Sequence, residues 1–484
     1  MDKQNAISKL QRFREELLQL FEARADALVD LLDALASSPH ARSVVELSLS
    51  PLFRRQYSSI SDAIAQLFHA RTPAQAAEER RSWEQKVARL IGRYLPAPHQ
   101  RKFWLFGTDV VPVSRPFAAT LEDRPFVYQP NAVGGNRPVT LGHQYSVTAC
   151  LPEKAHPDEP AWVVPLVVRR VQSTEKATVV GADQLTALLK DETQPFQGQL
   201  CVHVADSAYS AVAHLGRLGA QPNLVSVTRA PEHRVFYQQF EVPREEERKR
   251  GHPHWYGAPF VLKDSATWGP PDETTEATFT SQKGRTYQVQ LQAWHNLLMH
   301  GKRGLPMHRY PFTLIRAVVV DAQGRQVFKR ALWLIVLGTR RGELAAVEAW
   351  EAYAQRYDLE HYFRFGKQHL LLAAYQTPDV EHEENWLTLV QLATVQLWLA
   401  RELSESQRRP WERYLPLRPT AVASPSEVQR DWERIIRQIG TPARSPKPRG
   451  KSSGRAAGTR PGRRQRYPVV KKPSPGRKTS RPPA

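Results

Sequence analysis

Three acidic residues stand out because a carboxylate at each position needs a specific reason to be there. Asp109 lies in the apolar run 103–111, and Asp206 directly follows the apolar run 200–205. A charge among such residues is costly unless a cation meets it. Glu360 lies in a helical segment rich in basic residues. Carboxylates are the oxygen ligands that Mg²⁺ prefers, and two Mg²⁺ ions about 4 Å apart can promote in-line attack at phosphorus.

Asp206 also has a purely structural interpretation. It precedes Ser207 and the predicted helix 207–218, and aspartate is a common N-cap because its side chain accepts a hydrogen bond from a backbone N–H of the first turn. The residues around Asp206 favour neither interpretation, so a metal ligand and a helix cap both stay open.

A second pattern surrounds Glu360. Arg356, Glu360 and Lys367 follow Tyr353 by three, seven and fourteen positions. If the segment is one continuous helix with 3.6 residues per turn, these side chains share a face that presents a phenol, a guanidinium, a carboxylate and an ammonium. Asp358 points away from that face and is expected to tolerate Asn. An ordinary solvated helix face with ion pairs is the alternative, but it does not account for the whole stripe.

The order Tyr353-(2)-Arg356-(3)-Glu360-(6)-Lys367 resembles the Tyr-Arg-Glu-Lys signature of bacterial insertion-sequence transposases with a ribonuclease H-like DDE core. The resemblance covers roughly residues 100–405. Within it, one acid is expected on the first strand of the core and one just after the fourth.

The resemblance assigns roles to these residues. Asp109, Asp206 and Glu360 resemble the family's catalytic acids and would hold two Mg²⁺ ions, for which Mn²⁺ can substitute. In that case Asp109 would bridge the metals. The remaining signature residues would contact DNA phosphates near the cut end: Tyr353, Arg356 and Lys367.

The resemblance also implies partners and a location. These are double-stranded DNA with terminal inverted repeats, target DNA, and a second copy of the chain during synapsis, in a bacterial cytoplasm and associated with the nucleoid. The formal charge of +20 and the pI of about 10.0 independently favour a polyanionic partner. Two alternatives stay open: a domesticated, non-catalytic DNA-binding protein, and a ribonuclease H-like nuclease or resolvase without strand transfer.

Some weaker signals lie outside the signature. Similar transposases can stack an aromatic residue of their insertion on an extrahelical base, and Trp255, Trp268 and Trp294 are candidates here. Taken alone, each tryptophan fits a core or β-sheet position better than a DNA contact. Arg229 ends a predicted strand, where it would line the active-site rim or pair with a surface acid. The histidines His252, His254 and His300 lack a metal-ligand pattern and are interpreted as surface residues.

The elements that must position these residues indicate an α/β fold: a ribonuclease H-like core with a β-rich insertion, after an all-helical N-terminal domain and before a disordered basic tail. Apolar runs predict strands at 103–111, 144–151, 162–171, 200–205, 224–228 and 332–337, and helical spacing predicts helices at 182–190, 207–218, 343–374 and 383–403. The expected divisions are 1–95 (helical, DNA-end binding), 96–230 and 331–405 (core), 231–330 (insertion), 406–440 (helical) and 441–484 (tail).

The last 44 residues hold 14 Lys and Arg and no Asp or Glu. Such a segment buries too little apolar surface to offset the entropy of ordering, so it is predicted to be disordered. It would act as a flexible arm that adds affinity for DNA, or be a dispensable tail. The two cysteines, Cys150 and Cys201, are expected to be buried free thiols, and no apolar run is long enough for a membrane span.

Overall fold

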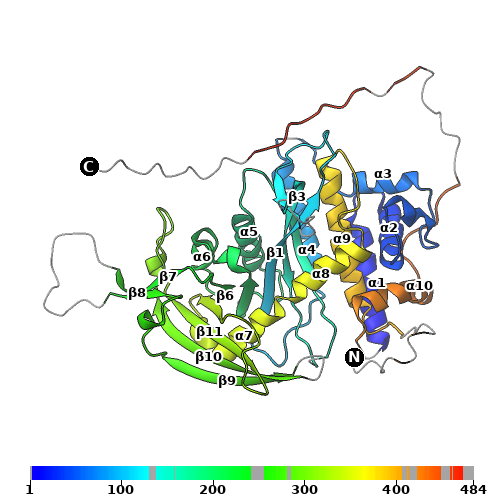
Figure 1. Cartoon of the computed structure of the whole chain (residues 1–484). Helices are drawn as coiled ribbons and strands as arrows, with labels where there is room; N and C mark the ends of the chain where they lie inside the picture. Colours follow the sequence, from blue (N-terminus) through cyan, green and yellow to red (C-terminus); the bar gives the residue numbers. More distant parts are fainter. Residues whose placement is uncertain are drawn as a thin grey trace.

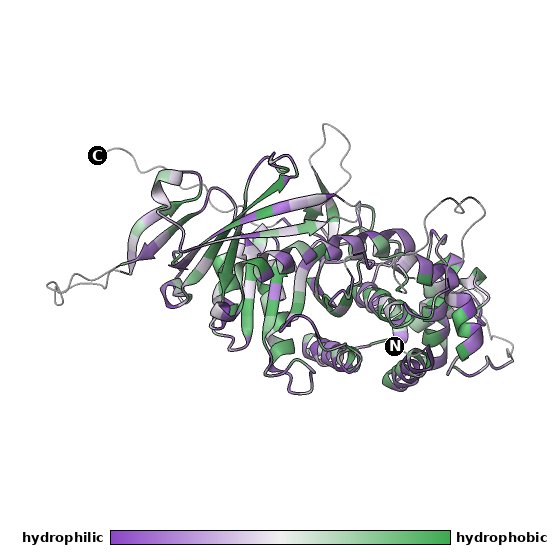
Figure 2. Cartoon of the chain, turned by 90° about the horizontal axis from the view of Figure 1, so that it is seen from below, coloured by the Kyte–Doolittle hydropathy of each residue, from purple (hydrophilic) through white to green (hydrophobic). Residues whose placement is uncertain are grey.

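The structure, a computed structural model, describes residues 3–72, 74–129, 138–156, 158–240, 255–280, 285–405, 411, 414, 422–448, 458–460 and 462–471. A large mixed sheet with helices packed against it forms the centre of this part of the chain (Figure 1). The strands in the middle of the sheet are predominantly hydrophobic (Figure 2), which is why they are buried on both faces.

The first half of the sheet has the topology expected for a ribonuclease H-like core. Three antiparallel strands, β1, β3 and β4, are followed by two strands parallel to β1, in the spatial order β4-β3-β1-β5-β6. A short strand, β2, pairs with β3 at the edge. The bounds are β1 (Trp104–Ser114), β2 (Phe126–Tyr128), β3 (Val139–Cys150), β4 (Val164–Val171), α5 (Ala177–Lys190), β5 (Cys201–Ala205), α6 (Val212–Leu218) and β6 (Leu224–Arg229).

The β-rich insertion extends this same sheet. The strand that follows the insertion, β12, pairs antiparallel with β6, and β11, β10 and β9 continue outward from it. Two further strands form a separate hairpin-like sheet, β7 with β8. The bounds are β7 (Val235–Gln239), β8 (Tyr256–Val261), β9 (Glu273–Thr280), β10 (Thr286–Leu297), β11 (Phe312–Asp321) and β12 (Leu332–Leu337).

The long helix predicted for 343–374 is two helices, so the prediction of one continuous helix is wrong. α7 (Ala346–Gln355) ends and α8 (Asp358–His369) begins around a turn at Arg356. There the backbone N–H of Arg356 bonds to the carbonyl of Tyr353 and that of Leu359 to the carbonyl of Arg356. These three-residue steps interrupt the four-residue ladder of an α-helix. Tyr353 therefore lies on one helix and Glu360 on the next.

The N-terminal helices share a hydrophobic core with the rest of the chain. One cluster of buried side chains includes Leu10, Leu32, Trp386 and Trp432, from α1, α2, α9 and α10. The division of the chain near residue 96 into separate domains stays a prediction. The bounds are α1 (Lys3–Leu20), α2 (Ala25–Ser37), α3 (Ser58–Gln66), α4 (Ala76–Gly92), α9 (Val380–Leu399) and α10 (Pro425–Ile439), with 3₁₀ helices at η1 (Val45–Leu49), η2 (Ser207–Ser210), η3 (Ser265–Thr267), η4 (Met307–Arg309) and η5 (Arg341–Glu343).

A buried charge network fixes α9 against the sheet. The Glu383 carboxylate of α9 accepts hydrogen bonds at 2.8 Å from Arg115 Nε, His143 Nδ1 and Tyr145 Oη. All four side chains are buried. Arg115 also donates to the carbonyls of Ala373 and Tyr375. Because its partners come from the end of β1 and from β3, this network ties the core strands to α9.

Two stretches of the basic C-terminal tail have defined contacts. Near the start of the tail, the backbone N–H of Arg444 donates to Asp26, and Arg54 donates to the carbonyl of Ala443. Residues 462–471 lie along the loop between β1 and β2. The prediction of disorder is therefore wrong for these two stretches. The ranges 449–457 and 472–484 lie outside the described residues.

None of the helices that the structure describes is long and apolar enough to cross a membrane.

Candidate active site

Parallel strand pairing brings the first two acids together. β1 and β5 are neighbours, with Gly107 opposite Val204. Asp109 comes two residues after Gly107 and Asp206 two residues after Val204. Since alternate residues of a strand face the same side and adjacent strands lie about 4.8 Å apart, both carboxylates project from equivalent positions at one edge of the sheet. Their proximity follows from the register alone.

Asp109 is in an environment that disfavours its charge. Its side chain is 18% exposed, and burial raises the pKa of Asp109 to about 6. The negative charges of Asp206 and Glu360 raise it further, against a lowering by the backbone N–H of Val110 and by Arg356. A carboxylate held this way gains most from a nearby cation.

Close packing of α8 on β1 brings Glu360 close to the other two acids. A Cβ at Gly107 would lie 2.8 Å from Cδ1 of Leu359, so the absence of a side chain at Gly107 lets Leu359 pack directly on β1. Glu360 follows Leu359 and comes to the same edge of the sheet. Arg356 then joins the acids: its Nη2 lies 3.0 Å from Oε1 of Glu360, and its Nη1 lies 3.6 Å from Oδ2 of Asp109.

Asp206 serves as a helix cap in this arrangement. Its Oδ1 accepts a 2.9 Å hydrogen bond from the backbone N–H of Ala208, and it is the N-cap of η2. The capping interpretation is thus confirmed, and it is compatible with the other one. The second carboxylate oxygen has no hydrogen-bond partner among the described residues, which leaves it available for a ligand.

Tyr353 and Arg229 lie beside these acids. The Arg356 guanidinium is 5.7 Å from the ring centroid of Tyr353. Burial raises the pKa of Tyr353, while the charges of Arg356 and Arg229 lower it. Arg229 follows Thr228, which is opposite Ala205, so Arg229 stands next to Asp206 in register. Of the two positions that the sequence left open for Arg229, the structure favours the one at the rim of the candidate site, beside Asp206 and Tyr353.

Lys367 lies apart from this group. It is seven residues beyond Glu360 on α8, about 10.5 Å along the helix axis. Burial lowers the pKa of Lys367, and none of the acids that the structure describes forms an ion pair with it. The structure therefore brings together Asp109, Asp206 and Glu360 with Tyr353 and Arg356, whereas Lys367 stays at the far end of the helix.

The carboxylates are not arranged as a preformed metal site. Within the described ranges, no three His, Cys, Asp or Glu side chains are grouped closely enough to hold a metal ion. The Arg356 guanidinium lies between Asp109 and Glu360 instead. In this conformation a side-chain cation neutralises the oxygens that would otherwise be free to bind a metal.

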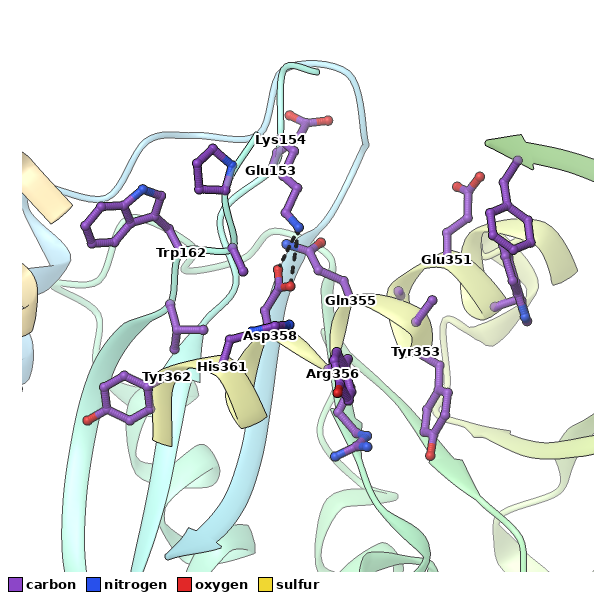
Figure 3. Close-up of a pocket in the computed structure, with 18 of the residues that line it drawn as sticks. Glu153, Lys154, Trp162, Glu351, Tyr353, Gln355, Arg356, Asp358, His361 and Tyr362 are labelled. Atoms are coloured by element: carbon purple, nitrogen blue, oxygen red, sulfur yellow. Dashed lines mark hydrogen bonds and ion pairs between the residues drawn. The ribbon is translucent and has the colours of Figure 1, made fainter. Parts of the chain in front are cut away.

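A cleft of about 1470 Å³ opens beside the junction of α7 and α8 (Figure 3). Tyr353 and Arg356 extend from the same side of this junction. Asp358 lies on the other side, buried and 3.1 Å from Lys154 Nζ. Asp358 therefore faces away from Tyr353 and Arg356, as expected. Its tolerance of Asn stays a prediction, and its burial and its ion pair with Lys154, 204 residues earlier in the chain, argue against that tolerance.

The three tryptophans of the insertion have different surroundings. Trp294 is buried, and Trp268 packs beside it in the aromatic core under β10 to β12. Trp255 is 40% exposed and stacks on His308 with 4.4 Å between ring centroids. Of the three, Trp255 is therefore the one with substantial exposed ring surface. His300 is exposed, as expected, and His252 and His254 lie outside the described residues.

The sequence of the chain is similar to that of a known family. The sequence model of the family described as DDE superfamily endonuclease matches residues 16–299. The matched range contains Asp109 and Asp206, and it ends before Glu360. No curated protein matches the chain. Because the match covers more than half of the sequence, the chain belongs to the DDE superfamily endonucleases, a family of nuclease-type enzymes.

Proposed function

We propose that this protein is a DDE transposase that cuts DNA at transposon ends and joins the ends to target DNA. The observation that carries the proposal is the in-register pair Asp109 and Asp206, with Glu360 tied to Asp109 through Arg356. Three carboxylates from separate elements at one sheet edge are the donor set of a two-metal phosphoryl-transfer site.

The residues that would hold the metals are Asp109, Asp206 and Glu360. Carboxylate oxygens suit Mg²⁺, with Mn²⁺ as a substitute. Bound there, the two ions would supply an activated water or 3′-hydroxyl and would stabilise the leaving oxygen. The raised pKa of Asp109 fits this role, because a buried carboxylate that is costly to ionise gains from binding a divalent cation.

The basic and phenolic residues beside the acids suit the substrate. Arg356 and Arg229 would contact phosphates next to the cut, since a guanidinium can donate two hydrogen bonds to one phosphate. The Tyr353 hydroxyl would donate a further hydrogen bond. Lys367, two helical turns farther along α8, would contact a more distant phosphate as a point charge. Once DNA binds, Arg356 would turn from the carboxylates to the phosphate and free oxygens for the metals.

The partners of this proposal are duplex DNA with terminal inverted repeats, a target duplex, and a second copy of the chain during synapsis. Trp255 is the residue proposed to stack on an extrahelical base, because its ring is exposed. A nuclease or resolvase without strand transfer would use the same acids, so the reaction product separates these two functions. A non-catalytic DNA-binding protein would have no need of the three acids.

Two assays test the proposal. Metal-dependent nicking of a supercoiled plasmid reports cleavage, and joining of a labelled 3′-hydroxyl end from the element's own terminus into that plasmid reports strand transfer. We expect both with Mg²⁺ or Mn²⁺. The variants Asp109→Asn, Asp206→Asn and Glu360→Gln should each lose at least about a hundredfold in cleavage while still binding DNA, since each removes a ligand charge at nearly constant volume.

Asp183→Asn is the matched control, because Asp183 is an exposed acid on α5 whose nearest cation is 3.7 Å away. It should cleave like the wild type. Retained cleavage in any of the three site variants would remove that acid from the proposed site. Cleavage without joining would favour the nuclease alternative.

A further inference from the structure

The basic segment at 462–471 is attached to the sheet at a defined place. The backbone N–H of Tyr467 donates to the carbonyl of Ala119 at 2.9 Å, and that of Val470 donates to the carbonyl of Arg124 at 3.1 Å. Pro125 and Val470 form a parallel β-bridge. Figure 1 shows this segment in red, crossing above the sheet at the end marked β3. We refer to residues 462–471 as the strap.

The loop that receives the strap is rigidly built. Arg124 is 3% exposed, and its guanidinium donates to the carbonyls of Leu121 and Arg115 at 3.1 Å, so the loop is closed around a buried cation. Asp123 adopts a left-handed backbone conformation and pairs with Arg170 at 2.6 Å. These contacts hold the loop in shape, and the carbonyls that anchor the strap therefore have fixed positions.

The two sides of the strap have different chemistry. Tyr467, Val469 and Val470 are half-buried against the loop, whereas the basic residues are exposed. Within the described part of the chain, no acid forms an ion pair with any of these cations. Glu122 is an exposed carboxylate of the receiving loop. Its single negative charge does not offset the four exposed cations of the strap, so the net charge here is positive. The exposed cations of the strap are Arg463, Arg464, Arg466 and Lys471.

The loop that holds the strap follows the end of β1, the strand that carries Asp109. β1 runs from Asp109 to Ser114 before the receiving loop begins, a span of roughly 17 Å at about 3.4 Å per residue. One base pair occupies about 3.4 Å of a duplex. A duplex cut at the acids and running along β1 would therefore pass the strap within about one helical turn of the cut.

From this placement, and on the basis of the proposed function, we infer that the strap is a fixed phosphate-binding site for duplex DNA beside the cut. Its arginines contact the backbone of the duplex from a docked position. A free polybasic arm would lose more conformational entropy for each contact, because the chain must be ordered when DNA binds. The docked strap has already lost that freedom on folding.

Two variants of the full-length protein separate docking from charge. Val470→Pro removes the anchoring N–H and leaves every charge in place. The triple variant Arg463→Gln, Arg464→Gln and Arg466→Gln removes three charges and leaves the anchor. Gln465→Pro is the control, because the backbone N–H of Gln465 has no hydrogen-bond partner among the described residues. Trypsin cleavage at the Arg466–Tyr467 bond, which neither proline blocks, reports docking: it should be faster in Val470→Pro than in Gln465→Pro.

DNA affinity is measured by fluorescence anisotropy on a labelled duplex between about 50 and 200 mM salt. The triple variant should lower the slope of log K against log salt by up to about 0.9 for each lost contact. Val470→Pro should weaken binding severalfold near 150 mM salt.

Two outcomes would contradict the proposal. If Val470→Pro binds like the wild type while the triple variant does not, the arginines act as a free arm. If neither variant changes binding, the strap is no DNA site. Plasmid nicking is measured on the same preparations. If the variants nick at the wild-type level, either outcome contradicts the strap proposal while the proposed function stands.

Discussion

Arg356 contacts two of the three acids at once. Its guanidinium occupies the space between Asp109 and Glu360, and its buried Nε has no hydrogen-bond partner among the described residues. A divalent ion and this guanidinium need the same carboxylate oxygens. Arg356 should therefore lower metal affinity before DNA binds, so that the loaded site forms only on the substrate.

Replacing Arg356 should separate metal binding from cleavage. In Arg356→Gln the affinity of the DNA-free protein for Mn²⁺ should rise about tenfold, because a competing positive charge within 4 Å of the carboxylates is gone. DNA cleavage should fall, because a phosphate contact is lost. Mn²⁺ titration followed by electron paramagnetic resonance measures the first effect. Arg364→Gln removes an exposed charge from the same helix and should bind Mn²⁺ like the wild type. Weaker Mn²⁺ binding in Arg356→Gln would contradict the competition.

At the scale of elements, the buried Glu383 carboxylate ties α9 to the core strands. Burial alone would raise the pKa of Glu383, but His143, Arg115 and Tyr145 together lower it below its ordinary value. Its contribution to stability is therefore complete above the ordinary pKa of a glutamate and is lost as the pH falls below it.

Glu383→Gln should lower the free energy of unfolding by about 3–5 kcal/mol, because it leaves the buried Arg115 cation without its counter-charge. Urea denaturation near pH 7 measures this. The adjacent Glu384→Gln is the control: Glu384 pairs with Arg170 and Arg80 near the surface, so the expected loss is smaller. Equal losses in the two variants would show that the buried Glu383 network stabilises the fold no more than the ion pairs of Glu384 do.

α6 introduces an acid-sensitive contact beside β5. His214 is fully buried, its Nδ1–H donates to the carbonyl of Thr178 at 2.8 Å, and in the described part of the chain its Nε2 has no hydrogen-bond partner. Burial lowers the pKa of His214 to about 4, the Thr178 carbonyl raises it, and Arg217 lowers it. The ring centroid of His203 lies 5.3 Å from that of His214. Burial likewise lowers the pKa of His203.

A lowered histidine pKa means that the unfolded chain binds protons more readily than the folded one. The stability due to neutral His214 is therefore complete above about pH 6.5 and is lost as the pH falls toward 4. His214→Gln should flatten the dependence of the melting temperature on pH in that window, and the exposed His300→Gln should not. An unchanged slope in His214→Gln would mean that other groups cause the acid sensitivity.

The sequence predicted the strands well and the junctions poorly, for physical reasons. Apolar runs reveal buried strands such as β1 and β5 directly, and the parallel register then places Asp109 beside Asp206. The break between α7 and α8 was missed because hydrophobic spacing continues across it, while the interruption is in backbone hydrogen bonds. Pairing between Asp358 and Lys154, and docking of the strap on Arg124, join residues distant in sequence, for which local composition carries no signal.

At the scale of the whole molecule, the N-terminal helices are bound into the main core by polar as well as apolar contacts. Arg14 of α1 is buried, pairs with Asp33 of α2 at 2.7 Å, and donates to Gln396 of α9 at 2.7 Å. The expected boundary near residue 96 would cut through this core.

Separated halves should consequently fail to fold cooperatively. Fragments 1–95 and 96–484 each expose apolar surface that the other covers, so neither should give a single sharp calorimetric transition, whereas mixing them should restore one. Scanning calorimetry with far-ultraviolet circular dichroism measures this. Independent, cooperative unfolding of both fragments would instead establish the helical region as a domain.

Gly107 touches neither metal nor DNA in the proposed reaction, yet it sets how closely α8 approaches β1. A Cβ there would lie 2.8 Å from Cδ1 of Leu359, so the Leu359 side chain would have to shift, which would disturb the packing next to Glu360. Substitutions at this position should therefore accumulate slowly over evolutionary time, even in lineages whose DNA-contacting surfaces diverge quickly. A copy of the gene that has lost its activity would be expected to reveal its decay here, with the three acids still intact in its reading frame.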